Sequence, residues 1–269
     1  MAGNFAQING ARLYYEVAGA GQPLVMVHAG IANSQMWDAQ FESFAQHYRV
    51  IRYDMRGYGQ TLPVAGEYSN RADLAALLDL LGVERALLMG CSKGGGVCMD
   101  FALEHPERAA ALIMVGSGPG GFDFDEPPPP QWDELVAAFK AGDLERTCEL
   151  EMQVWVDGQG RAAEQVNPAV RRKVYEMNLL ALQYEKLGLG TELPTLDPPA
   201  ARRMSDLTLP VLVVVGDHDT AYVRAAADFM VANLPNARRL TITDAAHVPN
   251  MEHPNIFNAG VLDFLKSIA

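Results

Sequence analysis

The chain has 269 residues, 49% of them hydrophobic, which is enough for a sizeable core in one domain or two. Its 33 acidic and 21 basic residues give a formal net charge of −12, which argues against nucleic acid or an anionic membrane as a partner. The N-terminus has neither the basic nor the apolar region of a signal peptide, no apolar run is long enough to span a membrane, and three cysteines suggest neither a disulfide framework nor a zinc site. We therefore expect a cytoplasmic protein without a metal.

Strand and helix patterns alternate along most of the chain, which is typical of a mostly parallel sheet covered by helices. Residues 5–18 predict a hairpin that turns at Asn9-Gly10. Six further strands are expected near 24–28, 49–53, 86–90, 111–115, 210–215 and 238–243, and helices near 35–47, 69–81, 93–104, 221–233 and 254–268. With the hairpin, these runs predict an α/β fold with a sheet of eight strands.

The alternating pattern is interrupted in the middle of the chain. Four consecutive prolines, Pro127 to Pro130, are followed by helical runs without a buried strand. Apolar side chains between Leu135 and Tyr184 are too numerous for a disordered segment. We interpret 119–205 as an all-helical domain inserted after the sixth strand, and residues 1–118 with 206–269 as the core domain.

A candidate nucleophile stands in the turn Gly90-Cys91-Ser92-Lys93-Gly94, between a predicted strand and a predicted helix. So tight a turn strains its central residue and leaves no room for side chains two positions away on either side. Glycine occupies both of those positions around Ser92. Around Cys91 they would be Met89 and Lys93, which do not fit. The pattern is the G-x-S-x-G nucleophile elbow, with Ser92 exposed at the carboxyl end of the sheet.

A serine hydroxyl needs a base, and the base needs an acid that orients it. One later strand ends in Gly216-Asp217-His218-Asp219, and the next is followed by His247. Serine, acid and histidine therefore follow one another in the chain order of α/β-hydrolases. Both Asp217 and Asp219 are candidates for the acid.

By these motifs the chain resembles α/β-hydrolase fold enzymes of the esterase, lactonase and C–C hydrolase kind. Residues 25–31 resemble the H-G-x oxyanion segment, 54–59 the D-x-R-G-x-G loop, and 247–254 the H-x4-E-x-P ending of that family. Ala29 stands where relatives usually have glycine. The backbone N–H of Gly30 and that of Ile31 are therefore alternative oxyanion donors.

The resemblance implies a Ser92–His247–Asp219 triad, because the family's G-x-x-D spacing selects Asp219 and leaves Asp217 as a turn residue. It also implies an oxyanion hole that contains the backbone N–H of Lys93, no cofactor, and a lid formed by 119–205.

The predicted function is hydrolysis of small to medium, mainly apolar carboxylic esters through an acyl-enzyme, by a monomer or homodimer. The alternatives are a lactonase or a C–C hydrolase of a ring-cleavage product and, further away, a non-catalytic binding protein of the same fold.

Several side chains have more than one interpretation. Met152, Trp155 and Met177 are predicted to line an apolar substrate pocket, or else to form the core of the lid. The ammonium of Lys93 is expected either to bind a substrate carboxylate or to be a solvated cation. His28 is expected to hold the oxyanion loop by hydrogen bonds.

Overall fold

The computed structural model describes residues 3–268; residues 1, 2 and 269, which belong to the predicted core domain, lie outside it. Its main sheet has eight strands, as predicted, and their order is β1-β2-β4-β3-β6-β7-β9-β10. The strands are β1 (Asn4–Ile8), β2 (Ala11–Ala18), β3 (Pro23–Val27), β4 (Arg49–Tyr53), β6 (Ala86–Cys91), β7 (Ala109–Val115), β9 (Val211–Gly216) and β10 (Ala237–Ile242). The pairs β1–β2 and β2–β4 are antiparallel, and the other neighbours are parallel.

The predicted hairpin turns at Asn9 and Gly10, which both have positive φ (46° and 84°). Two-residue hairpin turns favour such angles because their twist matches that of the strands. The central strands β3, β6, β7 and β9 are buried at almost every position. Parallel strands are buried in this way when helices cover both faces of the sheet.

Five helices supply this cover, and the sequence predicted all of them. Helices α2 (Asn70–Leu80), α3 (Lys93–Glu104) and α7 (Ala221–Asn233) pack on one face, and α1 (Asp38–Phe44) and α9 (Pro254–Ser267) pack on the other. The predicted helix at 35–47 consists of a short 3-10 turn, Ser34–Trp37, followed by α1. Among residues 3–268, no helix is both long and apolar enough to cross a membrane.

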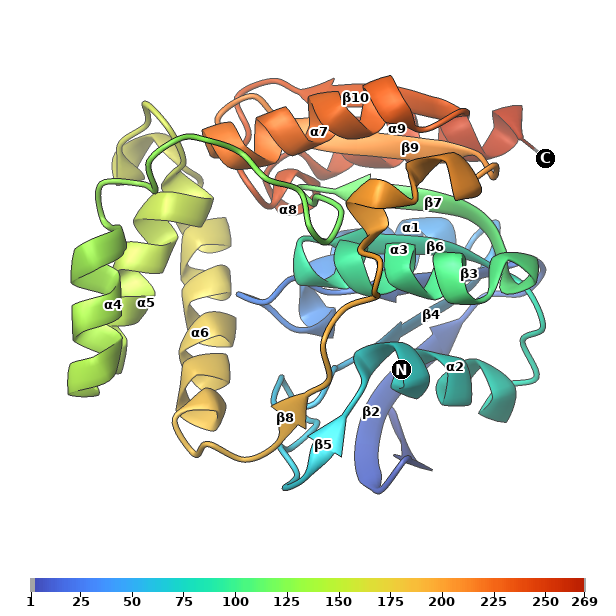
Figure 1. Ribbon diagram of the computed structural model, residues 1–269, viewed down its shortest axis with the longest axis horizontal. Coiled ribbons are helices and arrows are strands. Elements are labelled where there is room, and N and C mark those ends of the chain that lie inside the picture. Colours follow the sequence, from blue (N-terminus) through green and yellow to red (C-terminus); the bar gives the residue numbers. More distant parts are fainter. Residues whose placement is uncertain (1–2, 269) are drawn as a thin grey trace.

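A mainly helical insertion follows β7, the sixth strand of the main sheet. It contains α4 (Trp132–Ala141), α5 (Leu144–Glu151), a π-helical turn (Met152–Asp157) and α6 (Pro168–Glu185). Figure 1 shows α4, α5 and α6 as a separate group beside the end of the sheet where α3 begins.

The insertion also contains a strand, β8 (Thr191–Glu192), which pairs in parallel with β5 (Glu67–Tyr68) of the core. The prediction of helices alone missed it, because two exposed residues carry no apolar pattern.

Candidate active site

Ser92 lies in the sharp turn between β6 and α3. Its φ of 50° and ψ of −116° are strained for a residue with a side chain. A Cβ atom on Gly90 would overlap the backbone of Gly94, and one on Gly94 would overlap the backbone of Val27 and His28. Glycine is therefore required at both positions, and the turn has the geometry of a nucleophile elbow.

His247 and Asp219 form a buried pair near this turn. Nδ1 of His247 lies 2.9 Å from Oδ2 and 3.1 Å from Oδ1 of Asp219. Because a carboxylate only accepts hydrogen bonds, Nδ1 carries a proton and Nε2 is free to accept one. The backbone N–H of Thr220 also donates to Asp219, at 2.8 Å. Asp217 instead accepts from the backbone N–H of Ala245, so the carboxylate that faces the histidine is that of Asp219.

Ser92 and His247 line one cavity of about 520 Å³, called here the serine cavity. Its wall also includes Trp155, Tyr222 and the segment 116–121. This volume lies within the range of small-molecule sites.

The three side chains predicted to bind substrate, those of Met152, Trp155 and Met177, have different surroundings in the structure. The ring centroid of Trp155 lies 4.7 Å from that of His247, and the Trp155 carbonyl accepts the His247 backbone N–H at 3.1 Å. Met152 is completely buried in the apolar cluster that joins the insertion to the sheet, and Met177 belongs to the same cluster. Of the three, only Trp155 is part of the serine cavity wall.

The expected oxyanion donors lie together. Lys93 is the first residue of α3, where backbone N–H groups have no acceptor within the helix. A Cβ atom on Gly30 would lie 3.8 Å from Cβ of Lys93, so the two segments are in contact. The turn from Ala29 to Ala32 is closed by a backbone hydrogen bond of 3.2 Å, with Gly30 and Ile31 inside it.

His28 holds this turn in place, as expected. Its Nε2 accepts the backbone N–H of Met55 at 3.0 Å, and its Nδ1–H therefore donates to the carbonyl of Ala29 at 2.8 Å. Burial lowers the pKa of His28, which keeps the ring neutral, as these two bonds require.

The side chain of Lys93 matches neither sequence-based interpretation. Its Nζ forms a 2.6 Å ion pair with Glu192 of β8, whose other carboxylate oxygen accepts from the Asn70 amide, also at 2.6 Å. Burial opposes the charge of Lys93, but Tyr58 and Glu192 together raise its pKa above the ordinary value. The ammonium is therefore charged and already has a partner.

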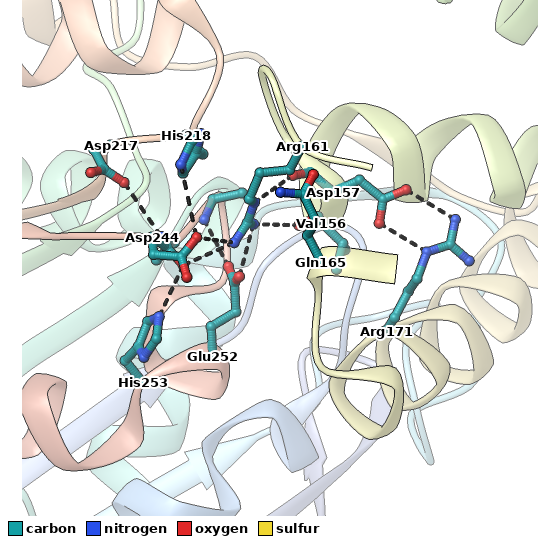
Figure 2. Close-up of polar contacts among 12 residues, drawn as sticks. Val156, Asp157, Arg161, Gln165, Arg171, Asp217, His218, Asp244, Glu252 and His253 are labelled. Carbon is teal, nitrogen blue, oxygen red and sulfur yellow. Dashed lines mark hydrogen bonds and ion pairs between the residues drawn. The ribbon is translucent and has the colours of Figure 1, made fainter. Parts of the chain in front are cut away.

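Arg161 of the insertion contributes to the candidate site, and the sequence analysis did not identify it. Figure 2 shows its guanidinium between the insertion and the loop that carries His247. It donates to the carbonyls of Val156, Asp157 and Asp244 at 2.8–2.9 Å and to the carboxylate of Glu252 at 2.8 Å.

Glu252 connects Arg161 to the backbone beside His247. Its second oxygen accepts the backbone N–H of Ala246, the residue before His247, at 2.7 Å. The H-x4-E-x-P motif pointed to Glu252, but no local pattern pointed to Arg161. The arrangement makes Arg161 a positioning residue for the His247 loop.

Comparisons with known proteins identify the family of the fold. Residues 22–254 match the family model of the alpha/beta hydrolase fold. The chain is 30% identical to a 2-hydroxy-6-oxononadienedioate/2-hydroxy-6-oxononatrienedioate hydrolase of Burkholderia vietnamiensis, over 95% of this chain and 91% of that protein. It is also 30% identical to a pimeloyl-[acyl-carrier protein] methyl ester esterase of Aeromonas hydrophila, over 89% of this chain and 93% of the relative.

A solved N-acyl homoserine lactone degrading enzyme superposes with a TM-score of 0.77 at 26% identity, over 97% of this chain and 100% of the other. The names of these proteins describe a dienedioate hydrolase, a methyl ester esterase and a lactone degrading enzyme, and the last of them shares its fold with the chain. The chain belongs to the α/β-hydrolase fold family.

Proposed function

We propose that this hydrolase cleaves small to medium, mainly apolar carboxylic esters, with Ser92 as nucleophile, His247 as general base and Asp219 as its orienting acid. One observation carries the proposal. The strained Ser92 and His247, whose ring contacts the buried Asp219, line the same cavity of about 520 Å³.

In the first step, Nε2 of His247 takes the proton of the Ser92 hydroxyl as Oγ attacks the ester carbonyl carbon. The carbonyl oxygen becomes an oxyanion, which accepts hydrogen bonds from the backbone N–H of Lys93 and of Gly30 or Ile31. Removing one such donor typically costs about 2.7–4 kcal/mol of transition-state stabilisation. The intermediate collapses to an acyl-enzyme, and His247 gives its proton to the departing alcohol.

In the second step, His247 takes a proton from water as the water oxygen attacks the acyl carbonyl carbon. The bond from that carbon to Oγ of Ser92 then breaks, and His247 gives its proton to Oγ, which releases the acid and free Ser92. Asp219 stabilises the imidazolium in both steps. These residues carry out the reaction without a cofactor.

The insertion, 119–205, is proposed as a lid over this site. Residues of the insertion, Trp155 and Glu192 among them, help to line the serine cavity, which supports the assignment. The remaining residues, 1–118 and 206–269, then form the core domain that carries the triad.

The second candidate is cleavage of a lactone or of a C–C bond. The names of a dienedioate hydrolase and a lactone degrading enzyme among the relatives favour it, whereas that of a methyl ester esterase favours the first candidate. The same triad serves all three reactions, so the substrate decides between them.

The test is a panel of p-nitrophenyl esters of increasing acyl length, run beside lactones and with labelling by a fluorophosphonate probe. We expect rapid labelling of the wild type, and a fall in kcat of roughly 10⁴–10⁶ for Ser92→Ala. Asp219→Ala should lose less, and the matched variant Asp217→Ala should remain close to wild type.

Retention of more than a few per cent of activity by Ser92→Ala would end the assignment. An unlabelled serine in a folded wild type would point instead to the non-catalytic binding protein. If Asp217→Ala loses more activity than Asp219→Ala, the acid is misassigned.

A further inference from the structure

Two cavities meet at the side chain that follows the nucleophile. The serine cavity is one, and the second, of about 320 Å³, is called here the polar cavity. Side chains of the polar cavity wall include Tyr58, Tyr68, Glu151, Asn178, Tyr184 and Glu185. The two cavity walls share two residues, Lys93 and Glu192.

These two residues form the ion pair that stands between the cavities. Lys93 comes from the core, directly after Ser92, and Glu192 comes from the insertion. The carboxylate is held on two sides, by the Lys93 ammonium at 2.6 Å and by the Asn70 amide at 2.6 Å.

The backbone on either side of Glu192 is fixed as well. The N–H of Thr191 donates to the carbonyl of Gly66 at 2.9 Å, and the N–H of Leu193 donates to that of Tyr68 at 2.7 Å. The carboxylate therefore has a defined place at the boundary.

We propose that the Lys93–Glu192 pair is a partition that limits how long a substrate chain the enzyme accepts. With the pair closed, the group attached to the reacting carbonyl has to fit within the serine cavity. With the pair removed, the polar cavity joins it and a longer chain fits. This inference rests on the proposed ester hydrolysis.

The side chains of the polar cavity indicate which kind of long substrate chain would bind there once the partition is open. Tyrosine hydroxyls and the Asn178 amide suit a chain that ends in a neutral hydrogen-bonding group such as a hydroxyl. The Glu151 carboxyl, which accepts from Asn178 at 2.6 Å, and that of Glu185 disfavour a chain that ends in a carboxylate.

The test compares kcat/KM for p-nitrophenyl ω-hydroxyoctanoate with kcat/KM for p-nitrophenyl acetate. In Glu192→Ala we expect the ratio of long to short substrate to rise by about tenfold or more, because the chain gains a space that wild type closes. Glu192→Gln should keep the ratio of wild type, because an amide of the same shape still accepts from Lys93 and bonds Asn70.

Glu134→Ala is the matched control, since Glu134 forms a 2.7 Å ion pair with Arg146 elsewhere in the insertion. Its ratio should equal that of wild type. If Glu192→Ala does not fold, Lys93→Ala opens the partition from the core side, and its ratio should rise in the same way whatever its absolute rate.

A ratio within about twofold of wild type in the opened variants would overturn the partition and leave the proposed function standing. An equal rise in Glu192→Gln would also overturn it, because charge rather than closure would then be responsible. A folded wild type that is inactive on every ester overturns the proposed function and the partition with it.

Discussion

Several ion pairs tie the insertion to the core. Two of them, Arg161–Glu252 and Lys93–Glu192, are built differently. Arg161 and Glu252 have side-chain exposures of 3% and 5%, whereas those of Lys93 and Glu192 are 32% and 34%. The guanidinium of Arg161 also binds three backbone carbonyls, whereas the ammonium of Lys93 has one close carboxylate.

The difference indicates what each pair does. A buried charge is tolerated only when its donors all find acceptors, and the rigid fork of arginine allows that. Such a contact fixes geometry, in this case that of the His247 loop. A half-exposed lysine pair contributes little to the stability of the fold, which suits a boundary that affects selectivity rather than folding.

The largest effect is expected at the buried pair. In Arg161→Met, Glu252 loses its charged partner and the loop before His247 loosens, so kcat should fall by about tenfold to a hundredfold. Arg161→Lys should also lose activity, because an ammonium cannot replace the fork. Steady-state kinetics on a short ester, with circular dichroism as a check of folding, measures the effect.

Arg171→Met is the control for this change. Arg171 pairs with Glu149 and, as Figure 2 shows, with Asp157, and all three residues belong to the insertion. Its kcat should remain near that of wild type. Wild-type kcat in a folded Arg161→Met would contradict a positioning role for Arg161.

A smaller effect is expected at the half-exposed pair. Lys93→Met should keep activity on neutral short esters within about tenfold, a loss under about 1.4 kcal/mol, because the proposed oxyanion contact comes from the backbone N–H. KM for a carboxylate-bearing ester should also stay unchanged, since Glu192 already occupies the ammonium.

The measurement compares one neutral and one anionic ester of equal acyl length. A rise in KM for the anionic ester alone would assign Lys93 to substrate binding. An equal, large fall in kcat for both would give its side chain a direct part in catalysis.

The smallest effect is a pH dependence of stability at Glu252. Burial raises the pKa of Glu252 above its ordinary value, although the Ala246 N–H and Arg161 act in the opposite direction. The folded protein therefore binds this proton more tightly than the unfolded chain, and the free energy of unfolding falls as pH rises from the ordinary to the raised pKa.

Glu252→Gln removes this contribution. Urea unfolding at pH values between about 4 and 7 should show the variant losing less stability than wild type as pH rises. If wild type gains stability relative to Glu252→Gln over that range, pairing with Arg161 outweighs burial.

The sequence predicted those features that depend only on residues close together along the chain. The glycines around Ser92 and the strand and helix runs of the core each occupy a short stretch of chain, so the elbow and the eight strands could be placed in advance. The choice of Asp219 rather than Asp217 as the acid required the spacing known from the family.

The two ion pairs could not be predicted, because each joins distant segments. Lys93 and Glu192 are 99 residues apart, and Arg161 and Glu252 are 91 apart. Nothing in the local pattern of a charged residue reveals which distant loop it will meet. For the same reason, Met152 and Trp155 looked equally suited to a pocket, although the structure buries one and exposes the other to the serine cavity.

The backbone of Ser92 has a consequence for how this protein can change over time. A non-glycine residue held at φ 50° costs roughly 1–3 kcal/mol, which the packing around Gly90 and Gly94 has to offset. Glycine would adopt the same backbone more easily, but it would remove the hydroxyl. Selection for stability alone therefore favours loss of the Ser92 hydroxyl. If Ser92 is the nucleophile, as proposed, the serine in this turn is retained only while the reaction itself is under selection.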